Sequence, residues 1–466
     1  MSLGDERLST TDNKGNRIFL YPAEVRGFFR RHRNIVEVAL ILFFLILPWL
    51  KWNGIQIFLF DIPNRTFHLF GILFKAHDAP LIFLVLAVGT ISLAFVTALF
   101  GRVWCGWACP QTVFIDGIYR RIEAWIQGNY IKRRKLSGEP WHKEKILKVS
   151  LTWLCYFVVS AVIAHSFVAY FVGSDRLIGM MTGTPKENWT AFTIVMGMTL
   201  VLLFNFGWFR EQFCIIACPY GRIQAVLMDK KSLSVMYDYN RGEPRKDPNI
   251  SKEKQGDCVN CNRCVEVCPT GIDIRRGIQM ECIGCTACID ACDEIMEKVK
   301  KPLGLIRYSS EFEIESKTHI SVRNKILRPR VLAYLFVILL MSTLLIYFVQ
   351  SRDPLMVSVL KAKEAPYSLI KENGEDRVLN HFKLHMHNQS SDIIFAQISS
   401  DIELVLPQNN LMLNPNTSRE IHFFAKFSTA LIRESGGSIK KDLRIDIRIN
   451  NKNTQILKEL TLVGPY

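Results

Sequence analysis

The hydrophobic and polar positions divide most of the chain into long uncharged stretches and charged connections. Four stretches of 19 to 24 residues contain no Asp, Glu, Lys or Arg, namely 80–100, 149–172, 189–209 and 331–349. About 20 apolar residues are enough for a helix to cross the hydrocarbon core of a bilayer. A fifth stretch, 35–50, is shorter and contains Glu37, but Trp49 and Trp52 suit an interfacial anchor at its end. The pattern therefore predicts five membrane-spanning helices.

The pattern changes after residue 350. Apolar and polar residues alternate over 381–387 and 443–449, a period of two that is typical of strands with one buried face. Turn-forming pairs such as Asn373-Gly374 and Asn414-Pro415 interrupt this region. About 115 residues of this kind suit a small antiparallel β-sandwich.

The basic residues predict how the spans are oriented. The numbers of Lys and Arg in successive connections are 7 in 1–34, 3 in 51–79, 9 in 101–146, 2 in 173–188 and 21 in 210–330. Basic connections favour the cytoplasmic side, so the N-terminus, 101–146 and 210–330 are expected there and 350–466 outside. This placement accounts for most of the net charge of +15. Because no basic–aromatic recognition pattern accompanies the charge, we expect no nucleic-acid partner.

Eight of the 13 cysteines lie between Cys258 and Cys292, in two motifs of identical spacing. Cys-x2-Cys-x2-Cys-x3-Cys is the spacing of bacterial ferredoxins, in which the fourth thiolate binds the neighbouring cluster. Asp293 stands where the second motif would usually carry proline, which alters the local turn but removes no ligand. A zinc site built from two Cys-x2-Cys pairs is the alternative. We predict two [4Fe–4S] clusters, cluster one held by Cys258, Cys261, Cys264 and Cys292, and cluster two held by Cys282, Cys285, Cys288 and Cys268.

Two further cysteine pairs form an internal repeat after the second and fourth spans. Their sequences are Trp104-Cys105-Gly106-Trp107-Ala108-Cys109-Pro110 and Phe213-Cys214-Ile215-Ile216-Ala217-Cys218-Pro219. If the backbone is helical, the i, i+4 spacing places both sulfurs of a pair on one face. Soft thiolates favour Cu(I), zinc or iron–sulfur clusters over hard ions, whereas the alternative is small apolar packing residues. We predict a shared redox or metal site formed by Cys105, Cys109, Cys214 and Cys218.

Together these motifs resemble the cytochrome c oxidase accessory protein family, known as CcoG, FixG or RdxA. The paired Cys-x3-Cys-Pro motifs, the double ferredoxin motif, the five spans and the β-rich tail resemble that family over nearly the whole length. The membrane half is also similar to polyferredoxin subunits of nitrate and nitrous oxide respiration, which share Cys-x3-Cys-Pro. The long β-rich tail favours the oxidase family.

The fold class that we predict is a multi-domain membrane protein. It comprises a five-helix transmembrane bundle, an inserted α+β ferredoxin module with two [4Fe–4S] clusters, and a C-terminal all-β domain that the resemblance makes immunoglobulin-like. The expected parts are a cytoplasmic segment at 1–34, a four-helix transmembrane region at 35–220, a cytoplasmic region at 221–329 with the ferredoxin module at 250–300, a fifth helix at 330–350 and a periplasmic domain at 351–466.

The resemblance implies a bacterial inner-membrane protein that acts in the assembly of cbb3-type oxidase. The family is linked to the reduction of Cu(II) to Cu(I), which would make the four paired thiols catalytic and copper a further bound metal. The expected partners are the lipid bilayer, copper chaperones or oxidase subunits, and an electron donor. That donor is a bound reductase or quinol, because no Gly-rich dinucleotide fingerprint follows a strand. Two alternatives stay open: an electron-transfer subunit of a respiratory reductase without a metal substrate, and a non-enzymatic docking factor.

Two weaker signals lie outside the cysteine motifs. His381, His385 and His387 share one face of a predicted strand. Imidazole suits copper, and a solvated strand face is the alternative. Glu37 is an acid within a predicted span, a type of residue that is often functional. Its position near the charged flank would also let it snorkel towards water.

Overall fold

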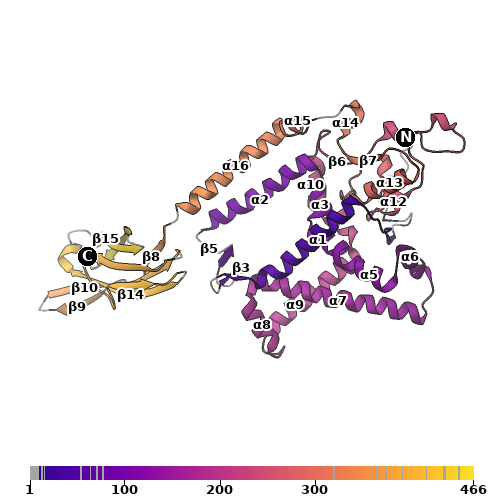
Figure 1. The fold of residues 1–466 in the computed structure, drawn as a ribbon. Helices are drawn as coiled ribbons and strands as arrows, with labels where there is room; N and C mark the ends of the chain where they lie inside the picture. The colour runs from indigo at the N-terminus through magenta and orange to yellow at the C-terminus, as the bar shows by residue number, and fades with distance from the viewer. Residues whose placement is uncertain are drawn as a thin grey trace. The chain divides into compact units, whose positions relative to one another are not determined.

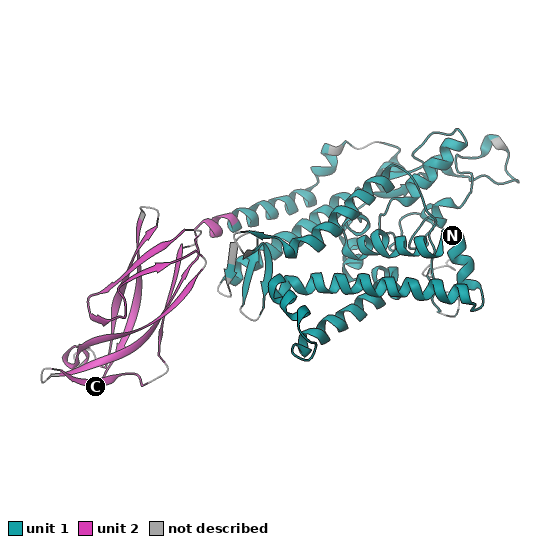
Figure 2. Cartoon of the chain, turned by 60° about the horizontal axis from the view of Figure 1, so that its bottom comes forward, with its two compact units in different colours: residues 1–345 teal, residues 346–466 magenta. Residues whose placement is uncertain are grey.

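The computed structural model divides the chain into two compact units, residues 1–345 and residues 346–466, which we call the N-terminal unit and the C-terminal unit (Figure 2). The structure describes residues 10–465 except 12–13, 15, 53–54, 63–64, 70–71, 76–77, 319–320, 352, 363–364, 373–374, 391, 416, 434–436 and 450–451.

Within the described part of the chain, five long helices are apolar and long enough to cross a membrane, as the sequence predicts (Figure 1). Their mean hydropathy lies between 1.5 and 2.5, and between 6% and 28% of each apolar window is buried within the protein. Large apolar side chains on them are exposed, such as Phe83, which suits contact with lipid acyl chains. The spans are α1 (Phe28–Ile46) with η1 (Leu47–Trp49), α2 (Ala79–Phe100), α7 (Lys143–Val172), α9 (Trp189–Leu202) with η4 (Leu203–Phe209), and α16 (Pro329–Gln350).

Short elements connect the spans. Between α1 and α2 lie β1 (Lys51–Trp52), β2 (Ile55–Gln56), β3 (Phe58–Asp61), β4 (Thr66–Leu69) and β5 (Ile72–Lys75). Between α2 and α7 lie α3 (Val103–Trp107), α4 (Pro110–Phe114), η3 (Ile115–Tyr119), α5 (Arg120–Gln127) and α6 (Tyr130–Gly138). α8 (Ser174–Thr182) follows α7. η5 (Phe213–Ala217) and α10 (Pro219–Leu227) follow η4.

The ferredoxin motifs lie in a small α+β module between α10 and α16. Its two strands, β6 (Ser234–Tyr237) and β7 (Ile306–Ser309), pair antiparallel and enclose both motifs in sequence. Buried apolar side chains such as Ile289 and Leu305 pack in one core with six of the eight cysteines of the two motifs. The other elements are α11 (Tyr239–Gly242), η6 (Lys252–Lys254), α12 (Arg263–Glu266), η7 (Ile274–Arg276), α13 (Ala287–Lys298), α14 (Glu311–Ser316) and α15 (Val322–Ile326).

The C-terminal unit contains two antiparallel sheets that share one apolar core. One sheet has the order β12-β14-β10-β8 with β9 paired to β10, and the other has the order β13-β11-β15-β16. The β-rich prediction is confirmed, while the immunoglobulin-like topology stays a prediction. The elements are β8 (Leu355–Lys361), β9 (Ser368–Glu372), β10 (Glu375–Asn388), β11 (Ile394–Ser400), β12 (Glu403–Val405), β13 (Asn410–Leu413), β14 (Ser418–Ser428), α17 (Thr429–Arg433), β15 (Ser438–Ile449) and β16 (Lys452–Val463).

The alternation along β10 matches its burial. Phe382, Leu384 and Met386 are buried in the shared core, so their odd-numbered neighbours lie on the opposite face. His385 on that face is exposed, whereas His387 is buried beside Ser418. The Asn373-Gly374 pair lies outside the described residues, and the strands on either side of it, β9 and β10, pair antiparallel.

Candidate metal centre

Each predicted ligand set lines its own cavity in the ferredoxin module. Cys258, Cys261, Cys264 and Cys292 line one cavity. A second cavity is lined by Cys268, Cys282, Cys285 and Cys288, together with Cys264. Each cavity therefore combines three cysteines of one motif with the fourth of the other, which is the exchange that the spacing predicts. The ligand assignment itself stays a prediction, and the cavities fit it.

The two motifs have the same backbone conformation. Asn260 and Gly284, each directly before the second cysteine of its motif, have φ of +58° and +67°. Asn262 and Thr286, each directly after that cysteine, have φ of +57° and +63°. Left-handed conformations are uncommon for residues other than glycine, so their repetition at matching positions marks a loop shape that both motifs need.

The two motifs end differently, and Asp293 explains why. Cys268 is followed by Pro269, and α12 has already ended at Glu266. In the second motif α13 continues through Cys292 and Asp293 to Lys298, because no proline interrupts it. The Asp293 carboxylate accepts a hydrogen bond of 2.8 Å from the backbone N–H of Gly304. The expected change in local turn is therefore a longer helix whose position is fixed by a side-chain contact.

The chemistry of these cavities suits an iron–sulfur cluster better than a single ion. Among the described residues, no three His, Cys, Asp or Glu side chains converge closely enough to hold one metal ion. A single zinc ion needs four converging ligands, whereas each iron of a cubane takes its own thiolate.

Burial raises the pKa of both Cys282 and Cys292 to about 12. The thiols therefore keep their protons at neutral pH until a metal displaces them.

The Cys-x3-Cys-Pro motifs share a backbone conformation that is not a continuous helix. Cys105 lies in α3 and Cys214 in the π-helical turn η5, but Cys109 and Cys218 are extended, with ψ of 126° and 112°. Proline disfavours the helical conformation in the residue before it and then begins α4 or α10. The helical premise for placing the sulfurs on one face is therefore wrong.

Side-chain contacts nevertheless bring the two motifs together. The Cys105 thiol donates a hydrogen bond of 3.2 Å to Oε1 of Gln224, which follows the second motif on α10. Gln111 and Asn205 exchange amide hydrogen bonds of 3.1 and 2.8 Å between α4 and η4. Burial and the nearby Cys109 raise the pKa of Cys105 to about 11, and Cys218 contributes in the same direction. Among the described residues, however, no three of these thiols converge closely enough to hold one metal ion, so the shared site of Cys105, Cys109, Cys214 and Cys218 stays a prediction.

The first motif also lies against the cluster-two loop. A Cβ atom placed on Gly106 would approach the carbonyl oxygen of Gly284 to 2.6 Å. The Arg102 guanidinium donates to the carbonyl oxygens of Cys282, at 3.1 Å, and Gly221, at 3.0 Å. It therefore joins the first motif, the cluster-two loop and the helix after the second motif. Cys105 and Cys214 pack against the buried group that includes Cys285.

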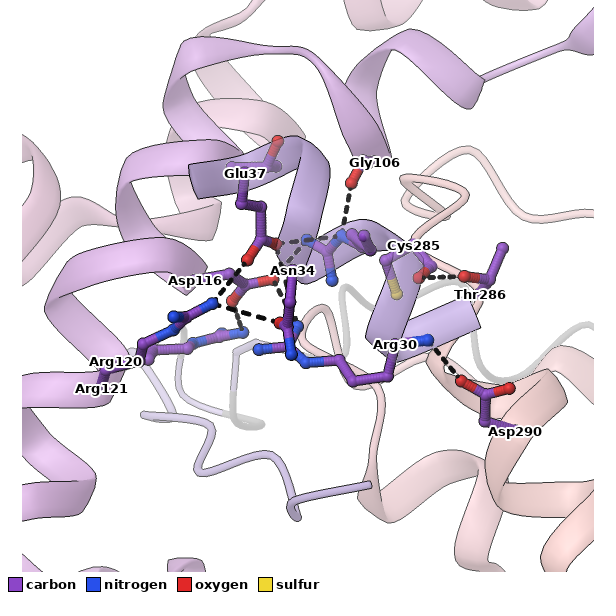
Figure 3. Close-up of polar contacts among 12 residues, drawn as sticks. Arg30, Asn34, Glu37, Gly106, Asp116, Arg120, Arg121, Cys285, Thr286 and Asp290 are labelled. Atoms are coloured by element: carbon purple, nitrogen blue, oxygen red, sulfur yellow. Dashed lines mark hydrogen bonds and ion pairs between the residues drawn. The ribbon is translucent and has the colours of Figure 1, made fainter. Parts of the chain in front are cut away.

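A buried ionic network connects α1 to this region (Figure 3). Arg33 donates 2.6 Å to the Gly106 carbonyl oxygen and pairs with Asp116 and Glu37. Glu37 is fully buried and also meets Arg121 at 3.3 Å, so it does not snorkel to water. The Asp290 carboxylate of α13 accepts hydrogen bonds from the backbone N–H groups of Phe29 and Arg30, at 3.1 and 2.7 Å, and so caps α1.

Comparisons with known proteins identify iron–sulfur domains and relatives of the chain. Residues 209–311 match a family model described as a 4Fe–4S dicluster domain, and residues 81–133 match one described as a 4Fe–4S binding domain. The chain is 34% identical to protein RdxB of Cereibacter sphaeroides, over 83% of each chain. It is 36% identical to protein RdxA of the same organism over 62% of each chain. It is also 32% identical to the nitrogen fixation protein FixG of Rhizobium meliloti, over 77% of this chain and 75% of that one.

The chain belongs to the RdxA, RdxB and FixG family. This membership and the two 4Fe–4S domain matches make the chain an iron–sulfur electron-transfer protein. Its five apolar helices make it a membrane protein. The match over 81–133 includes Cys105 and Cys109, and the match over 209–311 includes Cys214 and Cys218. Both Cys-x3-Cys-Pro motifs therefore fall within domains that are described by their iron–sulfur binding.

The sequence did not single out several residues that build this site. Arg33, Arg102 and Gln224 each contact a residue of a cysteine motif that lies far away in the chain. Asp116 pairs with Arg33. The spacing of Arg33 and Glu37 at i, i+4 was a usable signal for one pair. Among the weaker signals, Nε2 of His381 lies 3.0 Å from Nδ1 of His422 on the neighbouring strand, a contact that depends on strand register.

Proposed function

We propose that this protein acts in the maturation of cbb3-type cytochrome c oxidase by reducing Cu(II) to Cu(I) at the Cys-x3-Cys-Pro thiols. The observation that carries the proposal is the contact between the two cysteine systems. The Gly106 backbone lies against the Gly284 backbone, and Cys105 packs against the buried group that includes Cys285. A soft-ligand site and a predicted one-electron centre therefore adjoin each other.

The reaction is a one-electron reduction in which Cu(II) is the substrate. Cu(II) gains one electron and becomes Cu(I), which thiolates bind well because both are soft. A quinol or a reduced redox protein is the electron source, and cytoplasmic [4Fe–4S] clusters supply one-electron chemistry when bound. A thiol that ligates copper gives up its proton, so metal binding releases protons.

Side chains around the cysteine motifs hold the paired thiols and the ferredoxin module in a fixed relative position. Arg102 connects three backbone segments, and the amide pair of Gln111 and Asn205 fixes α4 against the fourth span. Gln224 holds the Cys105 thiol through its Oε1 atom. These contacts keep the paired thiols near the predicted cluster, so that copper and its electron source would be held close to each other.

The proposal includes a topology and partners. We infer a multi-pass protein of the bacterial inner membrane, with the ferredoxin module cytoplasmic and the C-terminal unit periplasmic. The reason is that connections rich in Lys and Arg alternate along the chain with connections that have few of them. Copper chaperones or oxidase subunits are the proposed partners. The proposal leaves the two alternatives distinct, since an electron carrier or a docking factor would not turn over copper.

Stopped-flow mixing tests the proposal directly. The holoprotein is reduced chemically, freed of reductant without oxygen, and mixed with Cu(II) while cluster absorbance and Cu(I) formation are followed. Cu(I) should form as the clusters oxidise, and Cys105→Ser should slow both changes at least tenfold. Cys155→Ser, a thiol within α7, is the matched control. Clusters that oxidise only with another protein would favour the respiratory subunit, and inert clusters the docking factor.

A further inference from the structure

A basic cavity lies against the cluster-two loop. None of the four cysteines of the Cys-x3-Cys-Pro motifs lines it. Its volume is about 230 Å³, and its walls come from the segment before α1, from α1, η3, α5 and α6, and from the ferredoxin module. Asp116 and Glu24 are the acids in the wall. The wall residues that matter here are Arg30, Arg33, Arg120, Arg121, Arg133 and Cys285.

The acids around the cavity do not satisfy all of these guanidinium groups. Asp116 meets Arg120 at 2.6 Å and also pairs with Arg33, so that carboxylate is already occupied. The Arg30 guanidinium lies 3.9 Å from a Glu37 oxygen and 4.0 Å from an Asp116 oxygen. Both distances exceed that of a hydrogen bond, so N–H donors of Arg30 remain available to a ligand.

Arg133 supplies a second, independent sign of a ligand. Its side chain is only 4% exposed, and its Nε atom is buried without a hydrogen-bond partner among the described residues. Its other contacts are a hydrogen bond of 3.2 Å to Glu123 and an ion pair of 3.9 Å with the exposed Glu24. Leaving a buried charged donor unsatisfied is costly, and because Arg133 lines the cavity, an anion bound there would place a counter-charge beside this guanidinium.

We propose that this cavity binds a phosphate group. Arg30 lines the cavity with a guanidinium that has no acid at hydrogen-bond distance, and a guanidinium fork matches the geometry and charge of phosphate better than those of any neutral ligand. Its volume is below that of pockets for drug-sized ligands, so the cavity takes a phosphate or a headgroup rather than a whole nucleotide. Arg30 and Arg33 lie at the start of the first span, where basic pockets between membrane helices bind lipid headgroups.

Figure 3 shows the arrangement that this proposal uses, with Arg30, Arg120 and Arg121 gathered near Asp116 and with Cys285 on the neighbouring loop. A bound phosphate would therefore contact α1 and α5 on one side and approach a predicted cluster ligand on the other. The proposal concerns binding alone, so it stands whether or not the protein reduces copper.

Two arms test the proposal and identify the source of the phosphate. The purified holoprotein is delipidated in detergent and titrated with inorganic phosphate and with pyrophosphate by calorimetry. In parallel, native mass spectrometry measures binding of phosphatidylglycerol. Arg30→Gln/Arg133→Gln is compared with Arg31→Gln/Arg134→Gln, which removes the same charge from exposed neighbours on the same helices. Iron content and the cluster spectrum confirm that each variant is folded.

The proposal is supported if at least one of the three probes binds the wild type and the control and binds Arg30→Gln/Arg133→Gln at least about tenfold more weakly. Inorganic phosphate or pyrophosphate identifies a soluble source, and phosphatidylglycerol alone identifies a lipid. Arg30→Gln by itself serves if the double variant loses its iron. The proposal is overturned if no probe binds, or if the cavity variants bind as tightly as the control.

Discussion

Gly106 lies so close to Gly284 that a Cβ atom on Gly106 would come within 2.6 Å of the Gly284 carbonyl oxygen. Gly284 is also tightly packed, since a Cβ on it would lie 3.0 Å from the carbonyl oxygen of Arg102, which precedes the motif. Backbone on both sides leaves no flexible side chain to move away. The first Cys-x3-Cys-Pro motif and the cluster-two loop therefore pack as one structural piece.

This contact predicts that Gly106→Ala disrupts the site. The added methyl group must displace backbone, so we expect a loss of about 1–3 kcal/mol in the free energy of unfolding and slower copper reduction. Thermal unfolding and iron content are the measurements. Gly89→Ala is the control, because no atom lies within 4 Å of a Cβ there, and alanine suits a helix interior. Equal stability of the two variants would contradict the packing argument.

The second prediction concerns Asp116, which is 5% exposed. Burial alone would raise its pKa, but Arg120, Arg33 and Arg30 more than offset burial and hold the pKa of Asp116 well below its usual range. Asp116→Asn leaves buried guanidinium charge uncompensated, so we expect a loss of about 3 kcal/mol. Asp175→Asn, which removes an exposed partner of Lys51, should cost at most about 1 kcal/mol.

The pH dependence of the Asp116 effect follows from the direction of that shift. A lowered folded-state pKa gives stability that is present above the unfolded-state pKa and is lost as pH falls through the folded-state pKa. The difference in Tm between the wild type and Asp116→Asn should therefore stay constant from about pH 8 to about pH 5. A difference that shrinks within this window would mean that the Asp116 carboxyl takes up a proton there.

The membrane spans and the ferredoxin loops could be predicted from the sequence, because short segments of the chain determine them. The spans follow from uncharged stretches, and the ferredoxin loops from cysteine spacing, because each signal lies within a short segment. The contact of Gly106 with Gly284 and the pairing of Arg33 with Asp116 join residues far apart in the chain, and no periodicity encodes them. The helical premise for Cys105 and Cys109 was wrong because Pro110 extends the residue before it.

The third prediction tests the ligand sets. Cys285→Ala removes one ligand of predicted cluster two, so iron should fall from about eight to about four per chain. The cavity lined by Cys258, Cys261 and Cys292 does not include Cys285, and cluster one should keep its spectrum. Cys155→Ala should keep all of the iron. About two irons per wild-type chain, or zinc in their place, would refute the assignment.

The fourth prediction concerns topology. Five crossings with a cytoplasmic N-terminus place the C-terminal unit outside, since an odd number of spans puts the two ends on opposite sides. Reporter fusions after Ser351 should be active only as exported enzymes, and fusions near Asn249 only as cytoplasmic ones. A fusion after Ser351 that is active in the cytoplasm would overturn this orientation and place the C-terminal unit inside.

The last prediction concerns the four membrane-edge thiols and separates a shared site from independent packing. The Cys105 thiol reaches Gln224 on the helix after the second motif, so the pairs are structurally coupled. If they bind copper together, Cys105→Ser alone should abolish most binding and reduction, and adding Cys218→Ser should change little further. If the sites are independent, the effects of the two substitutions on the free energy of copper binding should instead add within about 0.5 kcal/mol.

Copper titration of the two single variants and the double variant measures that coupling, with iron content as the control. The iron should survive both changes, because the eight predicted cluster ligands are other cysteines. Serine nearly preserves the volume while removing the soft thiolate, so lost packing contributes little to the result. If Cys105→Ser and Cys218→Ser each leave copper affinity and reduction rate unchanged, the thiols serve packing alone. Electron transfer to a partner protein, or docking without redox chemistry, would then be the better account of the molecule.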